Sequence, residues 1–151
     1  MAGSNDTHGG FRVNTAIILR GAAFLAALQG IAHGALFITA RPRHGDAEVA
    51  VIAAMKANRF FAGGLGYWDY YFGYGLIAAA ICIVEAVLCW QIATVAETQP
   101  LLVRPMLILL AVANVGHALL LARYFKFPLP IAFDLIIAAV LTVALAAKSR
   151  L

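Results

Sequence analysis

Four long apolar stretches dominate the chain, and most of the polar residues fall between them. The stretches cover about residues 13–40, 67–96, 101–124 and 128–148. Each holds about 20 residues or more, the helix length that crosses the roughly 30 Å hydrocarbon core of a bilayer. The pattern therefore predicts four transmembrane helices in a single domain over residues 13–151, an all-α integral membrane four-helix bundle.

The segment between the first two stretches has a different pattern. Pro42 and Gly45 break the first helix, and Asp46 is a suitable cap for a new one. Apolar residues then recur at helical spacing among charged ones, which predicts a short helix over about residues 46–62 that lies on the membrane surface. Residues 1–12 are polar and glycine-rich, and we expect them to form a flexible tail.

Composition excludes an ordinary soluble domain. The chain is 64% hydrophobic and 12% charged, whereas soluble domains are roughly 45–50% apolar and about 25% charged. Lys and Arg residues are spread over loops and chain ends, five on the side of the two termini and six on the other. This distribution leaves the membrane orientation open, and it offers no basic block that would bind nucleic acid. Cys82 and Cys89, seven positions apart on one helix, are too distant for a disulfide and are expected to be buried apolar side chains.

Several polar residues fall inside the predicted spans. An ionisable side chain at that depth costs roughly 2.5–3.5 kcal/mol, so each is a candidate for function. Counted from the end next to the surface helix, His33, Tyr74, His117 and Asp134 lie about 10 Å deep, and Glu85 lies about 25 Å deep. Four helices are thus expected to contribute polar groups to one leaflet.

Helical phase groups these residues into stripes. Gln29 and His33 are four positions apart, and Asn114 and His117 are three apart, so each pair shares a face. By the same rule, Tyr70, Tyr74 and Glu85 fall within about 40° of one another. We expect all three stripes to face the interior of the bundle.

Asp69 lies in the first turn of the second span, where a carboxylate complements the helix dipole. It is expected to cap the helix or to pair with Arg59, Arg123 or Lys126. Beside the neighbouring tyrosines and tryptophan, it is alternatively suited to orient a polar headgroup at a pocket mouth.

The intramembrane residues also have structural interpretations. Gln29, Asn114 and the tyrosines are suited to hydrogen bonds between helices, worth roughly 0.6 kcal/mol each. Glu85 is suited either to a hydrogen bond between helices or to binding a proton or a cationic ligand. His33 and His117 are suited to hydrogen bonding, or, at matched depth on two helices, to the axial ligation of a b-type haem.

The run Tyr67-Trp-Asp-Tyr-Tyr-Phe-Gly-Tyr-Gly-Leu76 resembles the signature of an uncharacterised family of small bacterial four-helix membrane proteins. Trp90-Gln-Ile-Ala93, Arg104-Pro105 and Arg123-Tyr-Phe125 fit the same resemblance, which covers the chain after about Val49. It implies a location in the bacterial inner membrane and supplies no catalytic residue. In size and helix number the chain is also similar to DoxX-like proteins, but without a shared motif.

These patterns favour a protein that binds a lipophilic small molecule, such as a quinone, an isoprenoid or a lipid. We expect a polar, aromatic-lined pocket in one leaflet, roofed by the surface helix. The alternatives are an accessory or scaffold subunit of a membrane complex and a bis-histidine haem protein for electron transfer. Enzymatic activity, any cofactor, and a partner such as a second copy of the chain or another membrane protein are left open. The candidate ligand-binding residues are Gln29, His33, Asp69, Tyr70, Tyr74, Glu85, Asn114, His117 and Asp134.

Overall fold

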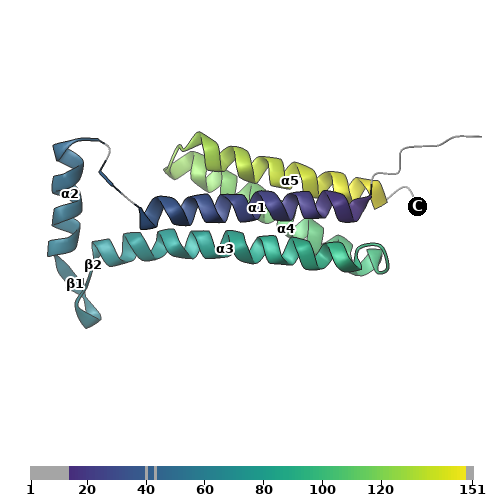
Figure 1. Cartoon of the computed structure of the whole chain (residues 1–151), viewed down its shortest axis with the longest axis horizontal. Helices are drawn as coiled ribbons and strands as arrows, with labels where there is room; N and C mark the ends of the chain where they lie inside the picture. Colours follow the sequence, from purple (N-terminus) through teal and green to yellow (C-terminus); the bar gives the residue numbers. More distant parts are fainter. Residues whose placement is uncertain (1–13, 40, 43, 149–151) are drawn as a thin grey trace, which may run out of the picture.

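The computed structural model describes residues 14–39, 41–42 and 44–148, and helices make up most of this part. α1 (Thr15–Ile38), α3 (Tyr67–Val95), α4 (Pro100–Tyr124) and α5 (Pro128–Lys148) form a bundle, and α2 (Asp46–Ala57) lies across one end of it (Figure 1). Each of the four bundle helices is long and apolar enough to cross a membrane. The chain is therefore a multi-pass membrane protein, and the predicted fold class is confirmed. The predicted tail, residues 1–12, lies outside the described residues.

Local signals explain where the long helices begin. Asn14 caps α1, because its side-chain oxygen accepts a hydrogen bond from the Ala16 amide at 2.8 Å. Asp69 caps α3 by accepting one from the Gly66 amide at 2.7 Å. Pro100 and Pro128 are the first residues of α4 and α5, where a proline costs no hydrogen bond.

The surface helix is shorter than the sequence suggested, since α2 ends at Ala57. Asn58 has an extended backbone, and its side chain donates a hydrogen bond to the Ala54 carbonyl at 2.8 Å, which closes the helix. A small antiparallel hairpin follows, formed by β1 (Arg59–Phe61) and β2 (Leu65–Gly66). The one-turn helix Ala62–Gly64 joins the strands, and Gly63 and Gly64 take the positive φ angles that this turn needs. The sequence pattern missed the hairpin because Phe60 also fits the helical spacing.

The bundle consists of two helical hairpins. α1 packs closely on α3, α4 packs on α5, and the hairpins meet mainly through α1 and α5, whereas α3 and α4 barely touch. Glycine residues allow α1 and α3 to pack closely. A Cβ atom on Gly30 would lie 2.9 Å from the Ala79 carbonyl oxygen, and one on Gly75 would overlap the ring of Phe37. Small residues on both helices, Gly30 on α1 and Gly75 on α3, are therefore packing sites.

The hairpins pack well at one end and diverge at the other. We call residues 15–30, 82–96, 100–114 and 134–148 the closed half, and residues 31–38, 67–81, 115–124 and 128–133 the open half. The closed half contains the apolar core, including the fully buried Leu19, Val103, Leu107, Ile137 and Leu141. In the open half α5 moves away from α1 (Figure 1).

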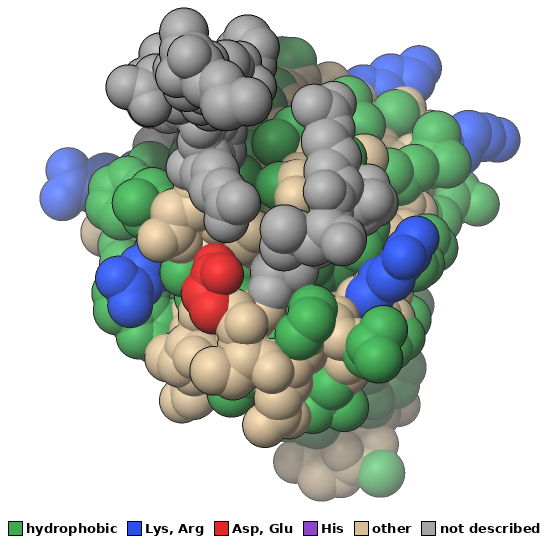
Figure 2. Space-filling model, turned by 90° about the vertical axis from the view of Figure 1, so that its right-hand side faces the viewer, with side chains coloured by type: hydrophobic (Ala, Val, Ile, Leu, Met, Phe, Trp, Pro, Cys, Tyr) green, Lys and Arg blue, Asp and Glu red, His purple; other side chains and the backbone are tan. Residues whose placement is uncertain are grey.

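The end of the closed half carries the turn between α3 and α4. Figure 2 shows this end with Lys and Arg side chains spread around its rim. Arg20 is among the cations of this half, and its guanidinium lies 5.2 Å from the centre of the Trp90 ring. Such a rim suits contact with lipid headgroups, which favour dispersed cations and amphipathic aromatics.

Candidate functional site

All four spans contribute a polar side chain at the level where the closed and open halves meet. We call this group the polar cluster. Depth and helical phase in the sequence indicated these members, and the structure joins them into two contacting groups that meet on α4. The members are Gln29 on α1, Glu85 on α3, Asn114 and His117 on α4, and Asp134 on α5.

Asp134 is the centre of the polar cluster. Only 2% of this residue is exposed, and both of its carboxylate oxygens have a neighbour. Gln29 Nε2 donates a hydrogen bond to Oδ1 at 2.9 Å, and His117 Nδ1 lies 2.8 Å from Oδ2. A carboxylate buried this deeply needs such partners, because transfer away from water without them is very costly. Asp134 therefore ties α1, α4 and α5 together through one carboxyl group.

Asn114 and Glu85 form the second part of the cluster. Asn114 is 4% exposed, and its Nδ2 donates to Glu85 Oε1 and, at 2.9 Å, to the Leu110 carbonyl of its own helix. The bond to Glu85 connects α3 and α4, which otherwise make few contacts. Asn114 and His117 are three residues apart on α4, so the two parts of the cluster lie on adjacent turns of one helix.

The position of Glu85 corrects the depth expected from the sequence. Counting from the first residue of α3 placed Glu85 about 25 Å deep, well beyond His117. The structure instead joins it to Asn114, one turn from His117. The count failed because α3 extends past the end of α1 towards α2 (Figure 1), so part of its length lies outside the bundle.

The two histidines occupy different environments. His33 lies one turn beyond Gln29, and its ring packs 5.0 Å from that of Phe37. The His117 side chain is 47% exposed although its Nδ1 contacts the buried Asp134. Within the described residues its other ring nitrogen, Nε2, has no hydrogen-bond partner. Asp134 thus holds the imidazole by one nitrogen and leaves the second available.

Tyr70 and Tyr74 do not face the bundle interior, and this prediction was wrong. Tyr74 is 70% exposed, and Tyr70 is 44% exposed with its ring 4.5 Å from that of Phe61 in the short hairpin. Helical phase placed them on the face of Glu85 correctly. However, other helices cover that face of α3 only at the level of Glu85, because the two helix pairs diverge in the open half, where the tyrosines lie.

Asp69 is also separate from the polar cluster. Its Oδ2 accepts hydrogen bonds from the Gly66 amide at 2.7 Å and from Arg59 Nη1 at 3.1 Å. Of the alternatives that the sequence left open, these contacts match capping and interfacial pairing with Arg59. The carboxylate therefore fixes the β1–β2 hairpin to the start of α3.

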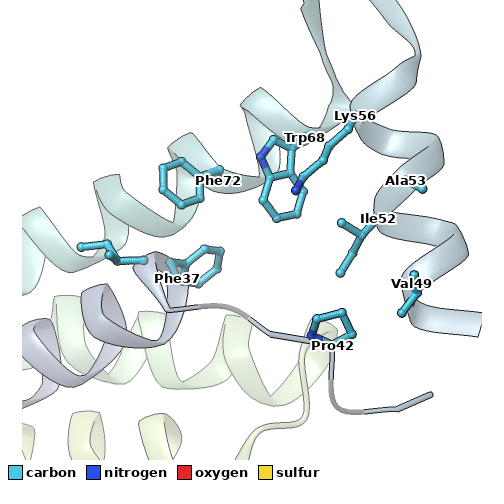
Figure 3. Close-up of a pocket in the computed structure, with 9 residues that line it drawn as sticks. Phe37, Pro42, Val49, Ile52, Ala53, Lys56, Trp68 and Phe72 are labelled. Carbon is cyan, nitrogen blue, oxygen red and sulfur yellow. The ribbon is translucent and has the colours of Figure 1, made fainter. Parts of the chain in front are cut away.

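A cavity of about 490 Å³ lies beneath α2, between this helix, the end of α1 and the start of α3 (Figure 3). We expected one pocket that is polar, aromatic-lined and roofed by the surface helix. In the structure, the polar residues and the aromatic cavity lie at two different places. The aromatic cavity is under α2, whereas the polar cluster lies deeper, and none of the candidate residues lines the cavity. The facing pairs Ile52/Lys56 and Trp68/Phe72, each four residues apart, were the available signal for it. The lining residues are Phe37, Ile38, Pro42, Val49, Ile52, Ala53, Lys56, Trp68 and Phe72.

The remaining candidate chemistry is limited. Cys82 and Cys89 are free and buried, as the sequence indicated. Among the side chains that the structure describes, no three His, Cys, Asp or Glu residues gather in a way that would hold a metal ion. The polar cluster is therefore the main intramembrane site to explain.

Comparison with known proteins gives no further guide. No model of a known protein family, no curated protein and no solved structure matches the chain. The likeness to small bacterial four-helix membrane proteins stays a prediction, and the functional argument rests on the geometry of the polar cluster.

Proposed function

We propose that the protein binds a lipophilic small molecule whose polar group reaches His117 and whose apolar part lies against the open half of the bundle. One observation carries the proposal. Asp134 fixes the His117 ring inside a membrane span, while Nε2 of that ring lacks a hydrogen-bond partner in the described structure and the side chain is 47% exposed.

In a bilayer, the free Nε2 atom of His117 needs a hydrogen-bond partner. Hydrocarbon offers no water to an exposed ring nitrogen, and an unsatisfied polar group there costs several kcal/mol. A lipid-soluble molecule with a carbonyl or hydroxyl group supplies the missing hydrogen bond. The neighbouring Glu85 offers a second polar contact at the same level.

The two protonation states of His117 match the two redox states of a quinone. When the Nδ1 proton is on the side of Asp134 Oδ2, which lies 2.8 Å away, a neutral ring accepts a hydrogen bond at Nε2 and a charged ring donates one. A hydroquinone hydroxyl matches the first state and a quinone carbonyl matches the second. Isoprenoid and lipid hydroxyl groups both donate and accept hydrogen bonds and so also match both states; the quinone is distinguished by exchanging its own acceptor and donor groups between its two redox states.

The open half supplies an apolar surface for the rest of the ligand. Leu119, Leu120 and Leu129 are more than half exposed there. We place the protein in a bacterial inner membrane, a location that the resemblance of the Tyr67–Leu76 run supports.

The test compares two histidine variants of the full chain purified in mild detergent. His117→Leu removes the proposed contact, whereas His44→Leu changes a histidine outside the spans that pairs with Glu48 at 3.2 Å. We expect a stoichiometric lipophilic molecule in organic extracts of the parent protein and of His44→Leu. Its occupancy should fall about tenfold in His117→Leu, the effect of losing one hydrogen bond of about 1.4 kcal/mol.

Two results would contradict the proposal. A parent protein that is empty and as stable as His117→Leu would favour the accessory or scaffold subunit, in which the polar cluster only joins helices. A haem absorption band in the parent that is lost on changing either His33 or His117 would instead identify the haem protein.

A further inference from the structure

The cavity beneath α2 combines apolar walls with a positive charge. Lys56 Nζ lies 4.4 Å from the centre of the Trp68 ring, and Ile52, Phe37 and Phe72 form the walls around it (Figure 3). The cavity is at the end of the spans, where α2 lies across the bundle (Figure 1). This is the level of lipid headgroups if the four spans cross the bilayer, and it suits tryptophan and lysine.

Among the described residues, no acid pairs with Lys56. The nearby Arg59 is already engaged, because its Nη1 donates to Asp69 at 3.1 Å and to the Gly64 carbonyl at 2.9 Å. Lys56 forms no ion pair within the described residues and contacts only the face of an indole. Lys56 is the one cation among the described residues that line the cavity, and it is available to an external anion.

We propose that this cavity binds one anionic phospholipid, with its phosphate at Lys56 and an acyl chain against Phe37, Ile52 and Phe72. The apolar walls match the acyl chain, and the uncompensated ammonium matches the negative headgroup. This site shares no residue with the polar cluster, so a test of lipid binding here is independent of the proposed small-molecule function.

The position of Trp68 gives a direct probe of the site. The chain contains two tryptophans, so Trp90→Phe leaves Trp68 as the only indole while keeping an aromatic ring beside Arg20. The full chain in this background is reconstituted into vesicles with brominated phosphatidylglycerol or brominated phosphatidylcholine. Quenching of Trp68 then reports which lipid occupies the cavity.

We expect Trp68 to reach half-quenching at about a fivefold lower fraction of phosphatidylglycerol than of phosphatidylcholine, the preference that one interfacial cation provides. Lys56→Met should remove this preference. The matched control is Arg123→Met, which removes a cation that lies 5.2 Å from the Tyr124 ring at the same end and does not line this cavity. This control should keep the fivefold preference.

A second variant tests occupancy by the acyl chain. Ala53→Phe fills the cavity from the exposed helix α2, where a larger side chain leaves the bundle core unchanged, and it should lower the quenching by both lipids. Equal quenching by the two lipids in the Trp90→Phe protein would overturn the proposal. A preference that survives unchanged in Lys56→Met or quenching that is unchanged in Ala53→Phe would do the same.

Discussion

The closed and open halves of the bundle have similar apolar sequences but pack differently. In the closed half, large side chains such as Leu19, Leu107 and Leu141 are fully buried between the hairpins. In the open half only Gly75, Ala79 and Ala118 are buried. The polar cluster lies at the boundary, so a tightly packed region holds its groups in place while the divergent region leaves one side accessible. Packing and accessibility are thus divided along the length of the same four helices.

The largest expected difference between the halves comes from truncating leucines on α5. Leu141→Ala should lower the free energy of unfolding by about 3–4 kcal/mol, since a fully buried side chain leaves a cavity. Leu129→Ala, at a position that is 68% exposed, should change it by less than about 0.5 kcal/mol. Denaturant unfolding in mixed micelles measures both. Equal losses would show that the open half is packed against a partner or closes in the membrane.

Glycine substitutions separate packing within a hairpin from packing between hairpins. Gly30→Ala should destabilise the protein by about 1–3 kcal/mol, because the added Cβ meets the backbone oxygen of Ala79 at 2.9 Å. Gly116→Ala on α4 meets nothing within 4 Å and should be neutral or stabilise by up to about 1 kcal/mol. The same unfolding measurement compares them. A large loss for Gly116→Ala would mean that another molecule covers this face of α4.

The sequence predicted the spans and much of the polar cluster. Long apolar runs fixed the number of helices, and the spacing of Gln29, Asn114 and His117 placed their side chains towards the other helices. Such predictions succeed because the hydrocarbon core restricts spanning segments to a narrow length and requires polar groups to find partners.

The sequence did not predict how the helices are offset and where they diverge. The depth of Glu85 depends on how far α3 extends beyond α1, and this follows from the contacts of Gly30 with Ala79 and of Gly75 with Phe37. The exposure of Tyr74 depends on the divergence of the hairpins. Both are properties of packing between segments distant in the chain, and helical periodicity carries no information about them.

The smallest expected effect concerns the hydrogen bond between α3 and α4. Asn114→Leu removes the donor to Glu85 while keeping the number and branching of side-chain heavy atoms, and it should cost about 0.6 kcal/mol, the average for such bonds in membranes. Glu85→Gln keeps an acceptor oxygen and serves as the matched control, with little change expected. Spin labels on the outer faces of α3 and α4 measure their separation.

The spin-label distance decides what keeps these two helices together. Because α3 and α4 touch little elsewhere, we expect a broader distance distribution in Asn114→Leu and an unchanged one in Glu85→Gln. An unchanged distribution in both variants would show that the apolar core of the closed half alone sets the separation. The bond between Asn114 and Glu85 would then orient Glu85 beside His117, and its contribution would be to the site and not to the fold.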